Sequence, residues 1–125
     1  MGSQPGNRGP VWMPVNYLII ESLQKFHQYY GPEFKVECPT GSQRFITILQ
    51  VAEELTRRLV GTSLRDAEGI RPAMRDYQRL RADPGFDHPI FYEHFDGDTG
   101  RGLGASHQTG WTGLVAKLLM PRDRD

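Results

Sequence analysis

The stretch that decides the fold is residues 14–30, PVNYLIIESLQKFHQYY. Its apolar side chains recur at spacings of three and four residues, which is the repeat of one face of an α-helix. Pro14 suits a first helical turn, because its missing N–H has no intrahelical partner there. Gly31-Pro32 follows and predicts the end of the helix. The apolar positions are Val15, Leu18, Ile19, Leu23, Phe26, Tyr29 and Tyr30.

A second amphipathic helix is predicted downstream, from Ser42 as N-cap to a stop at Gly61. Its opposite face is charged through Glu53, Glu54, Arg57 and Arg58. A link of about ten residues joins the two helices, a length that suits antiparallel neighbours. The apolar stripe comprises Phe45, Ile48, Leu49, Ala52, Leu55 and Leu59.

The remaining chain is less periodic. Residues 62–90 predict turns at 66–69 and 83–85 and a short helical turn at 75–81, and a last helix is expected over 111–120. Residues 1–10 are expected to be an irregular lead-in and residues 121–125 a solvated tail. The helical stripes are wide enough to need more than one neighbour each. The prediction is therefore an all-α chain, with about three main helices, that is part of a larger helical assembly.

Composition excludes several functional classes. The chain has 125 residues, enough for one domain, and fifteen basic residues balance fifteen acidic ones, so no net field attracts nucleic acid or anionic lipid. No apolar run approaches the roughly 18 residues that span a bilayer, and no signal peptide is recognisable, so a cytoplasmic protein is expected. Cys38 is the only cysteine and the four histidines are scattered, so neither a metal site nor another cofactor is expected.

The segment that could carry chemistry is residues 91–111, FYEHFDGDTGRGLGASHQTGW. Glu93 is bracketed by aromatic rings, which exclude water and offer flat surfaces to a sugar. The glycines let the main chain approach a ligand closely. From these residues alone, two interpretations stay open: a binding or catalytic site around Glu93, or an ordinary glycine-rich connection with Glu93 on the surface, where most carboxylates lie.

Three blocks carry a family resemblance: RGPVWMPVNYLIIESL at residues 8–23, VECPTGS at 36–42 and FYEHFDGDTGRGLGASHQTGWTGLVAKL at 91–118. In this order they resemble the C-terminal part of bacterial members of glycoside hydrolase family 63. That family includes mannosyl-oligosaccharide glucosidases, bacterial α-glucosidases and mannosylglycerate or glucosylglycerate hydrolases. The resemblance extends from about residue 7 to residue 119.

The resemblance implies the C-terminal portion of an (α/α)6 barrel, with residues 91–110 as a long active-site loop. It implies inverting hydrolysis of an oligosaccharide or small glycoside by two carboxyl groups, one acting as acid and the other as base. The family's aromatic-flanked glutamate corresponds to Glu93, which implies the general-base role. Substrate contacts are expected from the matching blocks, at Trp12, Trp111, Asn16, His107 and Gln108.

The chain departs from the family pattern in one respect. The family's general acid is an aspartate well upstream of the RGPVW block, and no aspartate here lies in such a motif. The resemblance thus implies a fragment that needs the missing N-terminal half of the barrel as its partner and is inactive alone. The aglycone stays open. The alternative is a non-catalytic helical remnant that binds sugar, or another protein, through Trp12 and Trp111.

Overall fold

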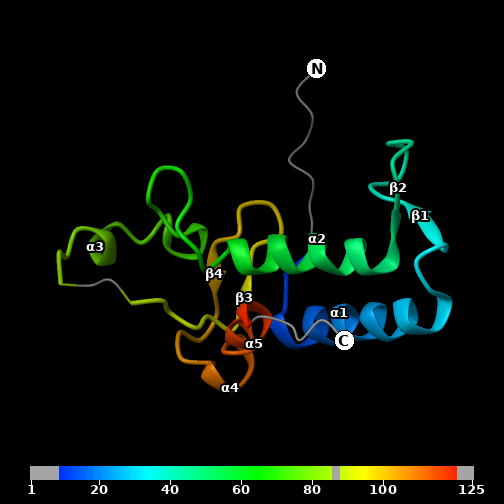
Figure 1. The fold of residues 1–125 in the computed structure, drawn as a ribbon. Helices are drawn as coiled ribbons and strands as arrows, with labels where there is room; N and C mark the ends of the chain where they lie inside the picture. The colour runs from blue at the N-terminus through cyan, green and yellow to red at the C-terminus, as the bar shows by residue number, and fades with distance from the viewer. Residues whose placement is uncertain (1–8, 86–87, 121–125) are drawn as a thin grey trace.

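Two antiparallel helices form the body of the protein, which is described by a computed structural model over residues 9–85 and 88–120. α1 (Met13–Tyr30) and α2 (Ile48–Gly61) lie side by side and run in opposite directions (Figure 1). The core includes Met13 and Ile20 of α1 and Ala52 and Leu59 of α2, all buried. The predicted helix over residues 14–30 and the antiparallel pairing are confirmed.

The start of the second helix was predicted wrongly. Residues expected in its first turn form a hairpin instead, in which β1 (Lys35–Glu37) pairs antiparallel with β2 (Phe45–Thr47). α2 begins after Thr47, whose Oγ1 accepts a hydrogen bond from the Gln50 N–H at 3.2 Å. The Gln50 side chain in turn accepts from the Thr47 N–H at 2.9 Å, which completes a capping box. Phe45 therefore lies on a strand, 63% exposed, and not on the helical stripe.

The second half of the chain consists of short elements around the N-terminal end of α1 and the C-terminal end of α2 (Figure 1). A 3-10 turn over Pro72–Met74 precedes α3 (Gln78–Arg81). β3 (His94–Phe95) and β4 (Gly102–Leu103) pair antiparallel. α4 (Thr109–Thr112) and α5 (Val115–Leu119) follow.

The single helix expected over residues 111–120 is thus divided into α4 and α5. Gly113 ends α4, with its N–H bonded to the Thr109 carbonyl at 3.1 Å. Glycine is a poor helix former, because its main chain loses more freedom on folding. The interruption lets Val115 of α5 turn into the core, where it is buried with Leu59 and Val60 at the end of α2.

Of the predictions for the less periodic segments, the two turns are confirmed and the other two need correction. The turn at residues 66–69 is confirmed by a 2.9 Å bond from the Gly69 N–H to the Asp66 carbonyl. In the turn at 83–85, the Gly85 N–H donates to the Asp83 side chain at 2.9 Å. The expected helical turn at 75–81 is shorter, as α3. The segment 91–110 is not a structureless loop, because β3 and β4 form a hairpin in it.

Helices predominate in the described residues, but the two small sheets correct the expectation of an all-α chain. Strands of two or three residues are too short to produce a recognisable alternation of apolar and polar residues. Most of the predicted lead-in (residues 1–8) and the predicted tail lie outside the described residues. Within the described part, no helix combines the length and apolar character that crossing a membrane requires.

Candidate functional site

Glu93 is held in place by hydrogen bonds to Ala105, which lies opposite it in the segment that follows β4. Its N–H donates to the Ala105 carbonyl at 2.8 Å, and the Ala105 N–H donates to Glu93 Oε2 at 3.0 Å. One carboxylate oxygen is thereby held by the main chain. The other, Oε1, accepts no hydrogen bond from any residue within 9–85 and 88–120. The side chain is half-buried, so it remains accessible from one side.

Gly104 makes this arrangement possible. Its φ of +73° lies in the left-handed region that favours glycine. A Cβ at this position would lie 2.5 Å from Glu93 Oε2 and 2.8 Å from Glu93 Cβ. Only a residue without a side chain can therefore occupy position 104 while Glu93 keeps its place. The glycine-rich composition suggested close approach to a ligand, whereas the close approach found here is to the glutamate.

Two tryptophans from distant parts of the sequence meet beside Glu93. Trp111, in α4, donates its Nε1–H to the Glu93 carbonyl at 2.8 Å. Trp12, the N-cap of α1, contacts Trp111 with ring centroids 5.4 Å apart at 37°. A bridge between Val11 and Phe95 holds the start of α1 against β3. The structure thus brings Glu93, Trp12 and Trp111 into one cluster.

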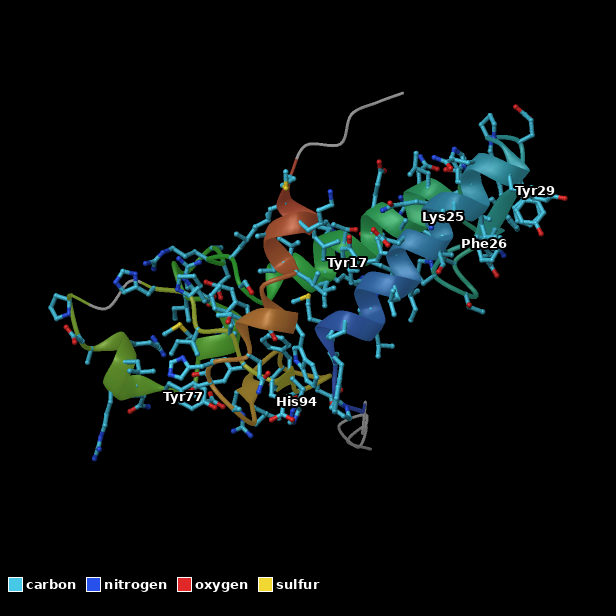
Figure 2. All side chains as sticks on the ribbon, turned by 90° about the horizontal axis from the view of Figure 1, so that it is seen from below. Tyr17, Lys25, Phe26, Tyr29, Tyr77 and His94 are labelled. Atoms are coloured by element: carbon cyan, nitrogen blue, oxygen red, sulfur yellow. The ribbon has the colours of Figure 1, made fainter. Side chains whose placement is uncertain are left out.

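His94 belongs to this cluster, although the sequence did not single it out as a site residue. Its ring stacks on Trp12, with centroids 6.0 Å apart and an interplanar angle of 19°. Its Nδ1 atom is buried and has no hydrogen-bond partner among the described residues. Figure 2 shows His94 beside the start of α1. The only sequence signal was its position next to Glu93.

Tyr92 supports the cluster from the core side, where it is 4% exposed. Its ring stacks on Tyr77, with centroids 5.3 Å apart, and covers Gly102, where a Cβ would lie 2.0 Å from it. The Tyr77 hydroxyl donates to the Gly102 carbonyl at 2.6 Å, and the Thr112 hydroxyl donates to the Tyr92 carbonyl. Burial, together with the neighbouring Tyr77, raises the pKa of Tyr92 to about 12.

The remaining predicted contact residues occupy the edge of the cluster. The Asn16 side chain donates to the Trp12 carbonyl at 2.8 Å, which steadies the first turn of α1. His107 is exposed and pairs through its main chain with Phe91. Gln108 precedes α4, and its N–H donates to the Phe91 carbonyl at 2.8 Å. Asn16 and Gln108 thus have structural contacts near Trp12 and Trp111.

The aspartates around the cluster have structural partners. Asp96 Oδ1 accepts hydrogen bonds from the Asp98 N–H and from the N–H and hydroxyl of Thr99, at 2.8–3.1 Å. These bonds, led by that of the Thr99 hydroxyl, hold the pKa of Asp96 below its usual range. Asp76 pairs with Arg101 at 3.3 Å. Both carboxylates thus have partners in or beside the hairpin.

The cluster lies at the surface of the described residues, where Trp12 is 38% exposed and Glu93 and Trp111 are half-buried. A hollow of about 400 Å³ lies elsewhere, between residues 65 and 88, where Arg65, Met74, Leu80 and Pro84 help to line it. None of Glu93, Trp12 and Trp111 lines that hollow. Pockets that bind small molecules bury most of their ligand's surface. Because Trp12, Glu93 and Trp111 are partly exposed, a ligand bound beside them would keep part of its own surface uncovered by the described residues.

Comparison with known proteins identifies similar stretches in longer chains. The protein is 51% identical over 121 residues to an uncharacterised protein of Saccharomyces cerevisiae, a match that covers 94% of this chain and 11% of that protein. It is 31% identical over 112 residues to the mannosyl-oligosaccharide glucosidase of S. cerevisiae, covering 90% and 10%. It is 29% identical over 112 residues to alpha-glucosidase 2 of Arabidopsis thaliana, again covering 90% and 10%.

The chain therefore spans about a tenth of the length of the curated relatives it matches. No family model matches the sequence, and no solved structure matches it significantly. Nearly the whole of the protein is thus similar to one stretch of a mannosyl-oligosaccharide glucosidase and of an α-glucosidase.

Proposed function

We propose that this chain is the part of a family 63 glycoside hydrolase that supplies the general base, Glu93. The observation that carries the proposal is the placement of Glu93 in one cluster with Trp12 and Trp111. Two named relatives are glucosidases, and the motif resemblance assigns the base role to this glutamate. The reaction is hydrolysis of an α-linked glucoside, or of a mannosyl- or glucosyl-glycerate.

The chemistry follows from the two oxygens of the carboxylate. A general base must hold a water molecule and accept its proton as the water attacks the sugar. The Ala105 N–H orients Oε2, which leaves Oε1 available for the water. Trp12 and Trp111 give the site apolar surfaces on which a sugar ring can stack. His94 stacks on Trp12 and fixes the plane of its indole.

Inversion requires a second carboxyl group, roughly 6.5–9.5 Å from the base, so that water fits between the base and the sugar. The family resemblance implies that the general acid is an aspartate upstream of the RGPVW block. In this proposal the acid therefore comes from a part of the hydrolase outside this stretch. The same part completes the (α/α)6 barrel and closes the open side of the cluster. Alone, the chain lacks useful turnover.

A chimaera provides the test. This chain replaces the matching stretch of the 51% identical S. cerevisiae relative, and release of glucose is measured on a panel of α-glucosides and glucosylglycerate. Nuclear magnetic resonance follows the anomeric form of the first product, which is β-glucose for an inverting enzyme. Glu93→Gln keeps the size of the side chain and removes its basicity, so the rate should fall by roughly 10²–10⁴.

The matched control is Glu53→Gln, on the exposed side of α2. It should leave the rate unchanged. Hydrolysis that survives Glu93→Gln would remove Glu93 from the base role. A chimaera that binds the sugars, seen by tryptophan fluorescence, without hydrolysing any of them would favour the non-catalytic sugar-binding alternative.

A further inference from the structure

The two ring nitrogens of His94 have different surroundings. Nδ1 is buried and has no hydrogen-bond partner among the described residues. Nε2 is neither buried in that way nor hydrogen-bonded within residues 9–85 and 88–120, and the side chain as a whole is half-buried. One nitrogen is therefore enclosed by the protein, and the other keeps a path to the surface.

This difference determines which nitrogen of His94 carries the ring proton. A neutral imidazole has one N–H, which donates, and one bare nitrogen, which accepts. A proton on Nδ1 would be a buried N–H without an acceptor, and unpaired donors are rarer inside proteins than unpaired acceptors. A proton on Nε2 lies where a partner can reach it. The surroundings therefore favour the tautomer in which Nε2–H is a hydrogen-bond donor.

The imidazole of His94 extends the flat surface of Trp12. The two ring centroids lie 6.0 Å apart, with 19° between the planes. Rings in direct face-to-face contact are about 3.5–4.0 Å apart, so the longer centroid distance means that the imidazole is displaced sideways. It covers only part of the indole. Trp12 is 38% exposed, so part of its surface remains accessible next to the imidazole.

One main-chain bridge holds both members of this pair. Val11 precedes Trp12, and Phe95 follows His94 in β3. The Val11 N–H donates to the Phe95 carbonyl at 2.8 Å, and the Phe95 N–H donates to the Val11 carbonyl at 2.9 Å. Phe95 is fully buried, which anchors the bridge in the core. The Nε2–H donor of His94 is therefore held in a fixed place beside Trp12 and next in sequence to Glu93.

A flat apolar surface with a fixed donor beside it matches the chemistry of a sugar. A sugar ring has apolar faces, which pack on an indole, and a rim of hydroxyl groups, whose oxygens accept from an N–H. We infer that His94 contacts the substrate by donating its Nε2–H to one hydroxyl of the sugar that stacks on Trp12. It thereby sets specificity for that hydroxyl. This inference rests on the proposed function, because it takes the ligand to be a sugar.

His27 provides a comparison within the same chain. Its Nδ1 is likewise buried and without a partner in the described part of the protein. His27 lies in the last turn of α1, and Figure 2 shows its neighbour Phe26 at the end of that helix remote from His94. The buried nitrogen by itself therefore indicates only a tautomer. The position beside Trp12 is what gives His94 a ligand.

Nuclear magnetic resonance of this chain tests the tautomer of His94. Ring 15N chemical shifts distinguish a protonated nitrogen from a bare one, and the His94→Phe variant identifies the signals of His94. The spectrum is recorded at about pH 8, where an ordinary histidine is neutral. The proton is expected on Nε2. A proton on Nδ1 would overturn the inference, whatever the chimaera does.

Sugar binding tests the contact. The chimaera with the S. cerevisiae relative carries Glu93→Gln, so that it does not consume the ligand. Calorimetry measures the Kd of methyl α-glucoside and of its 2-, 3-, 4- and 6-deoxy forms. Removal of the hydroxyl that accepts from His94 should weaken binding about fivefold, the equivalent of one ordinary hydrogen bond. In His94→Phe, which keeps a flat ring but has no nitrogen, that penalty should disappear and the other three should stay.

Two further variants separate the donor from the packing of the ring. The amide of His94→Gln reaches the place of the imidazole Nε2, so this variant should recover part of the lost penalty. His94→Asn is one carbon shorter and should not recover it. His27→Phe is the matched control and should leave all four penalties unchanged.

The outcomes distinguish this inference from the proposed function. Four penalties that are the same in His94→Phe as with the natural histidine would overturn the inference, while hydrolysis that depends on Glu93 would leave the proposed function standing. A chimaera that shows the lost penalty but never hydrolyses a glucoside would support the inference and remove the proposed function. Failure to bind any of the five sugars would overturn the inference as well.

Discussion

The α-carbon of Gly104 faces the Glu93 side chain so closely that an added methyl group would lie 2.5 Å from Oε2 and 2.8 Å from Cβ. The glycine also has a φ of +73°, which side chains rarely adopt. Gly104→Ala should therefore lower the free energy of unfolding by roughly 1–3 kcal/mol, from strain and from displacement of Glu93. Denaturant unfolding measures the loss.

Gly110→Ala is the matched control, because a Cβ there meets nothing within 4 Å. It should leave the stability unchanged or raise it slightly, since alanine favours the helix of α4. Equal effects of the two substitutions would contradict the close fit of Gly104 against Glu93.

The hydrogen bond from Trp111 to Glu93 predicts a second effect. Trp111→Phe keeps an aromatic ring beside Trp12 but removes the Nε1–H that donates to the Glu93 carbonyl. A typical hydrogen bond contributes about 1 kcal/mol, and the stability should fall by about that amount, as measured by urea unfolding. In the chimaera, the hydrolysis rate should fall as well, because the main chain that carries the base loses its support.

Trp12→Phe provides the comparison for that variant, since Trp12 contributes ring contacts to Trp111 and His94. It should affect sugar binding more than the position of the Glu93 main chain. A Trp111→Phe variant as stable as the natural chain would show that the bond contributes nothing to holding Glu93.

The buried Tyr92 predicts a fall in stability at alkaline pH. Its pKa is about 12 in the folded chain, against about 10 in an unfolded one. Below pH 10 the Tyr92 hydroxyl is protonated in both the folded and the unfolded state, so its contribution to the free energy of unfolding is fully present. As the pH rises from about 10 toward 12, the unfolded chain ionises first, and stability is lost.

Absorbance at 295 nm follows tyrosine ionisation directly, and thermal unfolding at each pH follows the stability. Tyr92→Phe should remove this part of the alkaline loss, because phenylalanine has no proton to release. An unchanged pH dependence in that variant would mean that Tyr92 does not set it.

Asp96 predicts an effect at acid pH with the opposite sign. The hydrogen bonds from Thr99 hold its pKa below the usual range, so the carboxylate stabilises the turn above its ordinary pKa of about 3.9. That contribution is lost as the pH falls through the lowered folded-state pKa. Thermal unfolding between pH 7 and pH 2 should show the loss.

Two substitutions separate charge from geometry at this turn. Asp96→Asn keeps an oxygen that can accept from Thr99, so it should preserve much of the stability while weakening the pH dependence. Asp96→Ala removes the acceptor and should lower the unfolding midpoint further at pH 7. If the two variants behaved alike, the hydrogen bonds to Oδ1 would not be what holds the turn.

The sequence predicted helices correctly along two stretches in which apolar residues recur at helical spacing. The spacing of Leu18, Ile19 and Phe26 predicted α1, and that of Ala52, Leu55 and Leu59 predicted the body of α2. It was less informative at the boundaries. Thr47 and Gln50 form the cap of α2, yet Ser42 after a glycine was an equally plausible N-cap. The choice between them depended on the pairing of β1 with β2, which no local pattern reveals.

For the candidate site, too, some features could be predicted from the sequence and others could not. The aromatic surroundings of Glu93 were readable from its neighbours in the sequence, as were Trp12 and Trp111 from the motifs that contain them. The need for a glycine at position 104 could not be predicted from the sequence, because it arises from the Glu93 side chain, which lies eleven positions earlier. His94 was missed for a similar reason: its contact is Trp12, at the far end of the described chain.

By itself, then, the sequence determined α1, the body of α2 and the turns at 66–69 and 83–85, and it singled out Glu93, Trp12 and Trp111 as residues to test. The tertiary structure alone decided that Glu93, Trp12, Trp111 and His94 meet. The physical reason is distance along the chain. Helical periodicity and turn preferences arise from neighbouring residues, whereas the bond from Trp111 to Glu93 spans 18 positions and forms only when the fold has brought its two ends together.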